Sequence, residues 1–397
     1  MRRMIELKRR AASWAAALCL VLGLAACGEG MKAPKTSGAL SAQLEEFASW
    51  DRVAGFGVSV FSPEEVFYEG AFGLSDIEAG AEYTISSTQN VASVSKVFIA
   101  AALMRAEEMG ALSIDDPVNK YLEFDVTNPH APNSAITLRQ LAMHTSGIKY
   151  SEKMTDELAF QHGDMPLGEF LRSYLSVDGE WYSPDNYHRE APGELGDYSN
   201  VGASLLALAI EEATDTPFDQ FTRQQVFDPL GMENTYWYRP GRTLSDSTHY
   251  TILGKSQFSA ASLTPDAMYP SGTLITSVPD LAKFVQMVMR NGEFEGVQVL
   301  SETSVDEMLH LQKLKSSLDD EIYRQGLLWY SAKDQLGVSR ELIGHNGGHN
   351  SAFAMMFFDP KTKRGLIMLG NTNLDPDHNH VAYFNIFKTL WLFSRST

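Results

Sequence analysis

Cysteine is almost absent from this chain. The 397 residues include two cysteines, Cys19 and Cys27, and both lie close to the N-terminus. The rest of the chain therefore contains no disulfide, and its stability must come from a hydrophobic core. A body of about 350 residues is long enough to bury such a core.

Basic residues are also scarce. The chain has 32 lysines and arginines against 50 aspartates and glutamates, which gives a formal net charge of −18. Residues 1–26 hold five basic residues and one acidic residue, so the chain that follows them carries −22. A surface this acidic repels phosphate backbones, and we expect no nucleic-acid partner.

Long hydrophobic runs are confined to the N-terminus. Five basic residues within Met1–Arg10 precede the apolar stretch Ala11–Ala26. This pattern predicts an export signal over residues 1–26, with an ordinary secretory signal or an uncleaved anchor as alternatives. No later segment approaches the length of a membrane span.

The end of this signal, Leu24-Ala25-Ala26-Cys27, resembles a bacterial lipobox. The resemblance implies a lipid on Cys27 as the only membrane anchor. Gly28 follows the cysteine where inner-membrane lipoproteins carry aspartate, which implies the periplasmic side of the outer membrane. Residues 27–40 are predicted to be a flexible tether.

Hydrophobic periodicity predicts strands near both ends of the chain and helices between them. We expect a sheet lobe built from about 41–110 and 265–395, and an inserted all-helical lobe over about 111–264. The expected strands are Arg52–Phe61, Glu65–Gly73, Gly326–Ser331, Ser351–Phe358 and Gly365–Gly370; the expected helices are Leu138–His144, Leu167–Leu175, Val201–Thr214, Phe218–Phe227, Pro279–Arg290, Ser301–Leu311 and Val381–Phe393.

The segment Asn90–Gly110 is predicted to contain a helix from Ser93 to Gly110. Ser93 and Lys96 then lie three residues apart on one helical face, where a lysine amine can reach a serine hydroxyl. The first turn would also stabilise negative charge beside Ser93. An apolar run follows Lys96 and favours a buried lysine with a lowered pKa. The alternative is a capping serine with a solvated lysine, because a Ser-x-x-Lys occurs often by chance.

Two other stretches favour the catalytic interpretation. Tyr198-Ser199-Asn200 lies at the entrance of a predicted helix, and Gly344–Asn350 forms a glycine-rich turn that leads into a predicted strand. Glycines at such a place let the backbone approach a substrate closely and leave N–H groups free to donate.

Together these motifs resemble the serine β-lactamase and penicillin-binding-protein superfamily, in particular class C β-lactamase-like serine hydrolases and esterases. The three motifs correspond to Ser93-Val94-Ser95-Lys96, Tyr198-Ser199-Asn200 and His345-Asn346-Gly347. The similarity extends over about residues 41–393. It implies a two-lobed α/β (α+β) fold with an antiparallel sheet flanked by helices.

The resemblance also implies a role for each site residue. Ser93 would be acylated, with Lys96 and Tyr198 sharing the role of base. Asn200 would orient Lys96 and hold a substrate carbonyl, and the N–H groups of Ser93 and Gly348 would form the oxyanion hole. Gly347 would line the strand edge, and Trp329 is expected either to line the cleft or to be buried.

His345 stands where the family carries a lysine. A mostly neutral histidine would pair poorly with a substrate carboxylate, which favours esters, amides or peptides over β-lactams. The alternatives are a β-lactamase or cell-wall peptidase on the same scaffold, and a non-catalytic envelope-binding protein. We expect no cofactor and no metal, because His349, His378 and His380 lack a third ligand at zinc spacing.

Overall fold

The structure is a computed structural model, and it describes residues 32–150, 155–238, 247–315, 322–332, 336, 338 and 340–396. The predicted signal segment and Cys27 lie outside these residues. Within the described part of the chain, no helix combines the length and apolar character that crossing a membrane requires.

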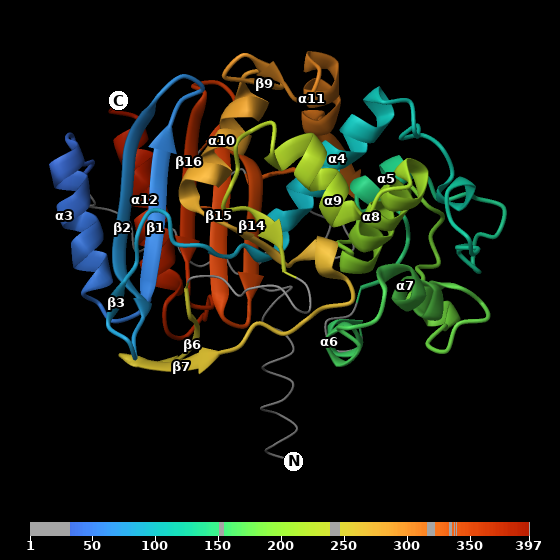
Figure 1. Ribbon diagram of the computed structural model, residues 1–397, viewed down its shortest axis with the longest axis horizontal. Helices are drawn as coiled ribbons and strands as arrows, with labels where there is room; N and C mark the ends of the chain where they lie inside the picture. The colour runs from blue at the N-terminus through green and yellow to red at the C-terminus, as the bar shows by residue number, and fades with distance from the viewer. Residues whose placement is uncertain are drawn as a thin grey trace.

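A nine-stranded antiparallel sheet forms the centre of the larger lobe (Figure 1). Its order, β11-β12-β13-β14-β15-β16-β1-β2-β3, places the N-terminal hairpin beside the C-terminal strands. The sheet thus combines strands from both ends of the chain. The strands are β11 (Gln312–Lys315), β12 (Ile322–Gln325), β13 (Tyr330–Ser331), β14 (Ile343–His349), β15 (Ala352–Asp359), β16 (Arg364–Gly370), β1 (Gly55–Phe61), β2 (Val66–Asp76) and β3 (Ala81–Glu82).

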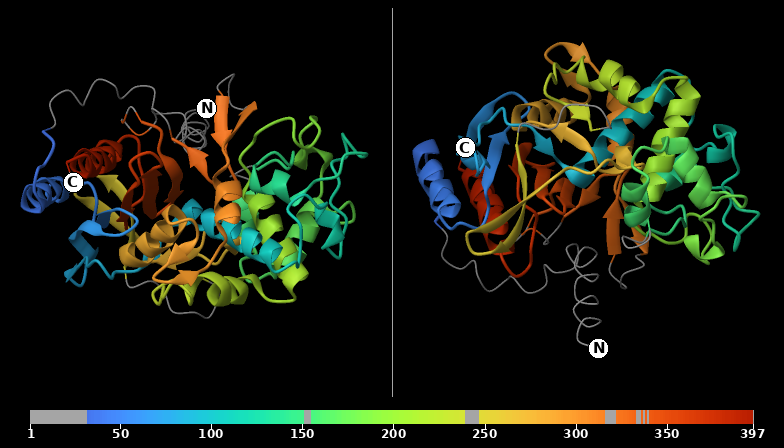
Figure 2. Two further views of the ribbon diagram at one scale, coloured as in Figure 1. Left: turned by 90° about the horizontal axis from the view of Figure 1, so that it is seen from above. Right: turned by 60° about the horizontal axis from the view of Figure 1, so that its bottom comes forward.

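Both faces of the sheet are covered by helices, as two views show (Figures 1 and 2). Helices α3 (Ser37–Ala48) and α12 (His380–Ser394) pack on one face, and α10 (Val278–Met289) packs on the other. The alternation of strand side chains explains this layering. Along β15, Phe353, Met355 and Phe357 belong to the core beneath α3 and α12, whereas the residues between them face the opposite core.

The second lobe is built mainly from helices around α8 (Asn200–Thr214), whose residues Val201–Ile210 are all buried. The helices in contact with α8 are α4 (Lys96–Glu108), α5 (Leu138–Ala142), α7 (Leu167–Leu175) and α9 (Phe218–Thr222). The lobe also contains α6 (Glu157–Gln161) and the π-helical turn η6 (Arg223–Phe227). Beside these, α11 (Glu302–Leu309) packs against α4.

The predicted all-helical span also contains strands. The hairpin of β6 (His249–Gly254) and β7 (Gln257–Ala261) joins the sheet lobe, because the N–H of Tyr250 donates to the carbonyl of Asn371 at 2.8 Å. A small separate sheet pairs β4 (Gln89–Asn90) and β5 (Tyr236–Trp237) with β8 (Leu274–Thr276). The inserted residues therefore form more than the helical lobe, because some of them belong to the sheet lobe.

Three local predictions were wrong. Residues 37–40 of the expected tether form the first turn of α3, which begins at Ser37 behind the capping side chain of Thr36. The glycine-rich segment expected as a turn is itself strand β14. Of the expected strand Gly326–Ser331, only Tyr330–Ser331 pairs, because Leu328 has a positive φ of 56° that turns the backbone.

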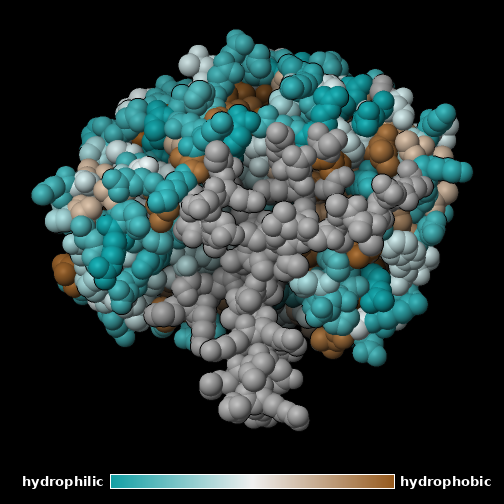
Figure 3. All heavy atoms as spheres, turned by 180° about the vertical axis from the view of Figure 1, so that it is seen from behind, coloured by the Kyte–Doolittle hydropathy of each residue, from teal (hydrophilic) through white to brown (hydrophobic). Residues whose placement is uncertain are grey.

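The exposed hydrophobic side chains are scattered over the surface. Seen from behind, the described surface is mainly hydrophilic, with isolated hydrophobic residues (Figure 3). Large hydrophobic side chains with high exposure are Val66, Met109, Val177, Leu253, Val297 and Val381. Single exposed residues of this kind are ordinary in soluble domains and do not by themselves mark an interface.

Candidate active site

Ser93 lies in a short 3-10 turn, η2 (Ala92–Ser95), that leads directly into α4. The α-helix therefore begins three residues later than the sequence predicted. Ala92, immediately before the serine, has a positive φ of 46°, and its N–H donates to Asn90 Oδ1 at 2.8 Å. A non-glycine residue in this region is strained, so surrounding contacts must hold the turn in place.

Lys96 is fully buried at the start of α4, as the apolar run after it predicted. Its Nζ lies 3.2 Å from Ser93 Oγ and donates to the carbonyl of Ser271 at 2.6 Å. Burial lowers the pKa of Lys96 to about 7, although the carboxylates of Asp156 and Asp266 oppose this shift. A substantial fraction of the amine is therefore neutral near pH 7 and able to accept a proton.

Tyr198 reaches the same serine from the helical lobe. Its hydroxyl donates to Ser93 Oγ at 2.7 Å, and Lys96 Nζ lies 4.9 Å from the centre of its ring. Ser199 caps α8 by accepting from the N–H of Gly202 at 3.0 Å, which fixes the turn that carries Tyr198. The structure thus brings Ser93, Lys96 and Tyr198 together as the sequence predicted.

His144 holds the turn around Tyr198. Its ring lies against the Tyr198 ring with centroids 4.6 Å apart, and its Nδ1 accepts from the N–H of Ser199 at 3.3 Å. Its carbonyl accepts from the N–H of Asp197 at 2.8 Å. Burial and the charge of Lys96 hold the pKa of His144 well below its usual value, so the ring is neutral.

Asn200 begins α8 beside this cluster, but it does not orient Lys96 as expected. Its buried Oδ1 has no hydrogen-bond partner among the described residues. A lysine can donate only to that oxygen, so the Lys96 contact is absent. The Asn200 side chain hydrogen-bonds instead to Asp156. Burial raises the pKa of the Asp156 carboxyl, and the hydrogen bond from Asn200 opposes part of this rise.

Two carboxyl groups near Lys96 had no sequence signal. The hydroxyl of Tyr150 donates to Asp156 Oδ2 at 2.5 Å, and the N–H of Met268 donates to Asp266 Oδ1 at 2.7 Å. Burial raises the pKa of Asp266 to about 7. Single aspartates in polar loops resemble any solvated residue, and only the fold shows that they influence Lys96.

Strand β14 forms the other wall of the site. A Cβ at Gly347 would lie 2.1 Å from the carbonyl oxygen of Val91 and 2.9 Å from the amide nitrogen of Ser93. The strand therefore approaches the serine turn so closely that only glycine fits. Gly348 follows on the same strand, opposite Phe353 of β15.

His345 is almost fully buried on β14. Its Nδ1 lies 2.5 Å from the carbonyl oxygen of Asn346, and its ring packs edge-on against Tyr330. Burial, followed by the charge of Lys96, lowers the pKa of His345 to about 3. The residue that replaces the family's lysine is therefore neutral throughout the physiological range.

Trp329 does not line the site. Its side chain is fully buried, stacked on Phe284 and edge-on to Phe358, each with ring centroids 6.2 Å apart. These neighbours belong to the core between the sheet and the helices. Of the two expectations for Trp329, the structure shows burial and not lining of the cleft as a substrate-binding residue.

No group of three potential metal ligands occurs among the described residues. Of the loop histidines considered above, His378 pairs with Asp375 through a 2.7 Å contact. The cluster at Ser93 consists of a hydroxyl, an amine and a phenol, which are the groups that acyl transfer by a serine requires.

The fold and this cluster define a class of protein, the β-lactamase-like serine hydrolases. A model of the family described as Beta-lactamase matches residues 41–390. The chain belongs to this family.

Curated relatives are distant. Protein flp of Staphylococcus aureus (strain MW2) is 23% identical over 337 residues, which cover 84% of this chain and 62% of that protein. The putative penicillin-binding protein PbpX of Bacillus subtilis (strain 168) is 27% identical over 231 residues, or 57% of this chain and 52% of that protein. The chain thus spans less than two thirds of the length of these relatives.

Solved structures share the fold. The octameric penicillin-binding protein homologue from Pyrococcus abyssi aligns with a TM-score of 0.68 at 22% identity, over 89% of this chain and 77% of that one. A class C β-lactamase from Rhodobacter sphaeroides aligns with a TM-score of 0.67 at 18% identity, over 89% and 99%. The hydrolase EstCE1 aligns with a TM-score of 0.67 at 17% identity, over 89% and 99%.

Proposed function

We propose that the protein hydrolyses an ester, amide or peptide bond through an acyl-enzyme on Ser93. The observation that carries this proposal is the convergence of Lys96 Nζ and the Tyr198 hydroxyl on Ser93 Oγ, at 3.2 and 2.7 Å. A serine hydroxyl becomes a useful nucleophile when an adjacent base can take its proton. The buried, partly neutral Lys96 supplies that base.

Acylation would begin with a proton-coupled addition to the substrate carbonyl. Ser93 Oγ attacks the carbonyl carbon of the substrate while the hydroxyl proton moves to Lys96, either directly or through the Tyr198 hydroxyl. The N–H groups of Ser93 and Gly348 receive the developing oxyanion. The bond between the carbonyl carbon and the leaving group then breaks as the leaving group takes a proton from the same pair, which leaves the acyl group on Ser93 Oγ. A water activated near Tyr198 hydrolyses this acyl-enzyme.

The neutral His345 favours substrates that do not depend on a carboxylate. A permanent cation at this position would bind such a group through a charge-assisted hydrogen bond. Burial holds the pKa of His345 near 3, so that cation is missing here. Esters, amides and peptides without a neighbouring carboxylate are therefore favoured over β-lactams.

Turnover of a p-nitrophenyl ester compared with a chromogenic cephalosporin tests this preference. We expect hydrolysis of the ester by the wild-type protein, little turnover of the cephalosporin, and loss of both in Ser93→Ala. Faster turnover of the cephalosporin would instead support the second candidate, a β-lactamase or cell-wall peptidase. No turnover and no covalent adduct would support a binding protein that keeps the fold.

We also propose that a lipid on Cys27 anchors the domain to the periplasmic side of the outer membrane. The support is the basic and apolar segment 1–26 with the residues Leu24–Cys27 that follow a lipobox pattern. Mass spectrometry of the N-terminal peptide from bacterial membranes tests it. A diacylglyceryl group on Cys27 is expected, and an N-terminus without lipid would contradict the anchor.

A further inference from the structure

Asn90 ends strand β4, just before the turn that carries Ser93, and its side chain is buried. Its Oδ1 accepts from the N–H of Ala92 at 2.8 Å, and its Nδ2 donates to the carbonyl of Gly272 at 3.0 Å. A neutral amide is the side-chain group that accepts and donates at once in this way. It joins the serine turn to a segment 182 positions further along the chain.

The segment that contains Gly272 also carries the acceptor of Lys96. The 3-10 turn η7 (Tyr269–Ser271) precedes Gly272, and the carbonyl of Ser271 accepts from Lys96 Nζ at 2.6 Å. The N–H and the hydroxyl of Ser271 both donate to the carbonyl of Met268 at 3.0 Å. Because these bonds keep the turn compact, a bond from Asn90 to Gly272 also restrains the adjoining Ser271 carbonyl.

The other bond of Asn90 restrains the turn of Ser93 itself. Ala92 has a positive φ of 46°, a conformation that a residue with a Cβ keeps only where its surroundings impose it. An asparagine that accepts from the N–H two residues later forms an Asx turn, which supplies such a constraint. Loss of this bond would let the turn relax and move Ser93 Oγ away from Lys96 Nζ and the Tyr198 hydroxyl.

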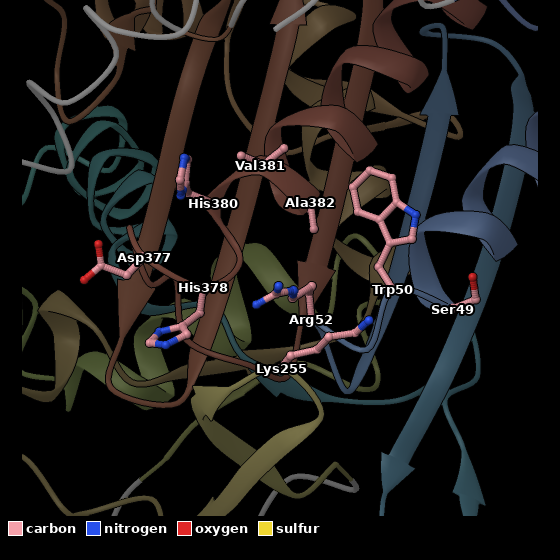
Figure 4. Close-up of a pocket in the computed structure, with 9 residues that line it drawn as sticks. All are labelled: Ser49, Trp50, Arg52, Lys255, Asp377, His378, His380, Val381 and Ala382. Carbon is pink, nitrogen blue, oxygen red and sulfur yellow. The ribbon is translucent and has the colours of Figure 1, made fainter.

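The β6–β7 hairpin supports Asn90 through its backbone. The N–H of Asn90 donates to His249 Nε2 at 3.2 Å. Burial and the neighbouring His349 lower the pKa of His249 to about 3, so this nitrogen remains an acceptor at neutral pH. At the other end of the hairpin, Lys255 and Arg52 line a hollow of about 480 Å³, where Figure 4 shows their charged ends directed apart. The hairpin therefore acts on the serine turn through His249 and not through this hollow.

We propose that Asn90 is a positioning residue for the acyl transfer proposed at Ser93, a role that depends on that function. Its amide fixes the serine turn relative to the carbonyl that binds Lys96, so that Ser93 Oγ and Lys96 Nζ stay within 3.2 Å. Asn90 does not touch the reacting atoms. Its effect on the rate comes from alignment, and a small displacement of a nucleophile from its base slows a reaction strongly.

The test compares the full chain with three variants. Asn90→Ala removes both side-chain bonds, whereas Asn90→Ser keeps an acceptor for the N–H of Ala92 and lacks the amide that donates to Gly272. Asn379→Ala is the matched control, because Asn379 is equally buried at the start of α12. Its Oδ1 accepts from the N–H of Asp375 at 2.8 Å and its Nδ2 donates to the carbonyl of Asn373 at 2.7 Å. Thermal midpoints, steady-state kinetics with a p-nitrophenyl ester and the rate of fluorophosphonate labelling at Ser93 are measured for each protein.

We expect both alanine variants to melt at a lower temperature than the wild type. At a temperature where all are folded, Asn90→Ala should lose at least about tenfold in kcat and in labelling rate with KM nearly unchanged, and Asn379→Ala should keep the wild-type kcat. Asn90→Ser should recover part of the loss.

A wild-type kcat in folded Asn90→Ala would overturn the positioning role and leave the proposed function intact. If Asn90→Ala does not fold, Asn90→Ser decides, and a wild-type kcat in that variant would overturn the role as well. A wild-type protein that neither hydrolyses the ester nor gains an adduct at Ser93 would overturn the proposed function, and the positioning role with it.

Discussion

The hydroxyl of Tyr198 lies 2.7 Å from the Oγ of Ser93, although 105 positions separate the two residues in the chain. One residue belongs to the turn before α4 and the other to the turn before α8, and these two buried helices pack against each other. The contact therefore depends on the packing of the whole helical lobe. The serine hydroxyl and the tyrosine hydroxyl are thereby brought together beside the buried Lys96.

The pH dependence of acylation follows from the buried Lys96. Its pKa is lowered to about 7, so the neutral amine that accepts a proton increases as the pH rises through 7. We predict that kcat/KM for an ester rises about tenfold per pH unit below this pKa and levels off above it. Stopped-flow or plate assays from pH 5 to 9 measure the profile, and a rate that falls from pH 6 to 8 would contradict the role of Lys96.

The same lysine should make stability depend on pH. The pKa of Lys96 is about 7 in the folded chain and 10.5 in the unfolded chain, so the unfolded chain binds more protons between these values. The free energy of unfolding therefore rises with pH across this window. Below pH 7 the fold carries the full cost of a buried ammonium.

Lys96→Gln tests this linkage, because glutamine can still donate to the carbonyl of Ser271 while carrying no charge. We predict that the thermal midpoint of the variant, relative to wild type, is highest at pH 6 and declines as the pH rises above 7. Thermal unfolding at pH 6, 7.5 and 9 measures the difference. A constant difference across this range would show that Lys96 keeps its ordinary pKa.

His144 is predicted to be a positioning residue for Tyr198. His144→Asn keeps a side chain that tolerates the positive φ of 56° at this position but removes the ring that packs on the phenol. We expect kcat to fall about 10- to 100-fold with little change in KM, because the phenol loses its alignment with Ser93. Steady-state kinetics separate the two constants; an equal loss of folding cooperativity and activity would indicate a purely structural role.

Gly347 should tolerate no side chain. A Cβ there would meet the Val91 carbonyl oxygen at 2.1 Å, so Gly347→Ala must displace β14 or the serine turn. We predict a lower thermal midpoint and a large loss of ester hydrolysis. Gly38→Ala in α3 is the matched control, since nothing lies within 4 Å of a Cβ placed at Gly38. Wild-type activity in Gly347→Ala would show that the close approach is unimportant.

The elements that could be predicted from the sequence are those whose buried residues recur with the spacing of a helix or a strand. The helix Leu167–Leu175 was predicted with its observed bounds, and the β1–β2 hairpin within three residues of them. The serine, lysine and tyrosine were identified because each stands in a motif with a fixed offset. These features are local, and local patterns are what a single sequence records.

The remaining features depend on contacts that the sequence does not display. Strand β14 was predicted as a glycine-rich turn, whereas it is a paired strand in which the serine turn packed against Gly347 requires glycine. For Trp329 the sequence left lining of the cleft and burial open, because the direction of a single indole depends on contacts made only in the folded chain. His144, Asp156 and Asp266 reach the site only through the folded helical lobe.

The proposed function depends on acylation of Ser93. Incubation with a fluorophosphonate followed by intact-protein and peptide mass spectrometry detects this modification. We predict one adduct on the peptide containing Ser93, no adduct in Ser93→Ala, and labelling slowed by orders of magnitude in folded Lys96→Ala. An unmodified wild-type protein, or labelling of Lys96→Ala at the wild-type rate, would contradict it.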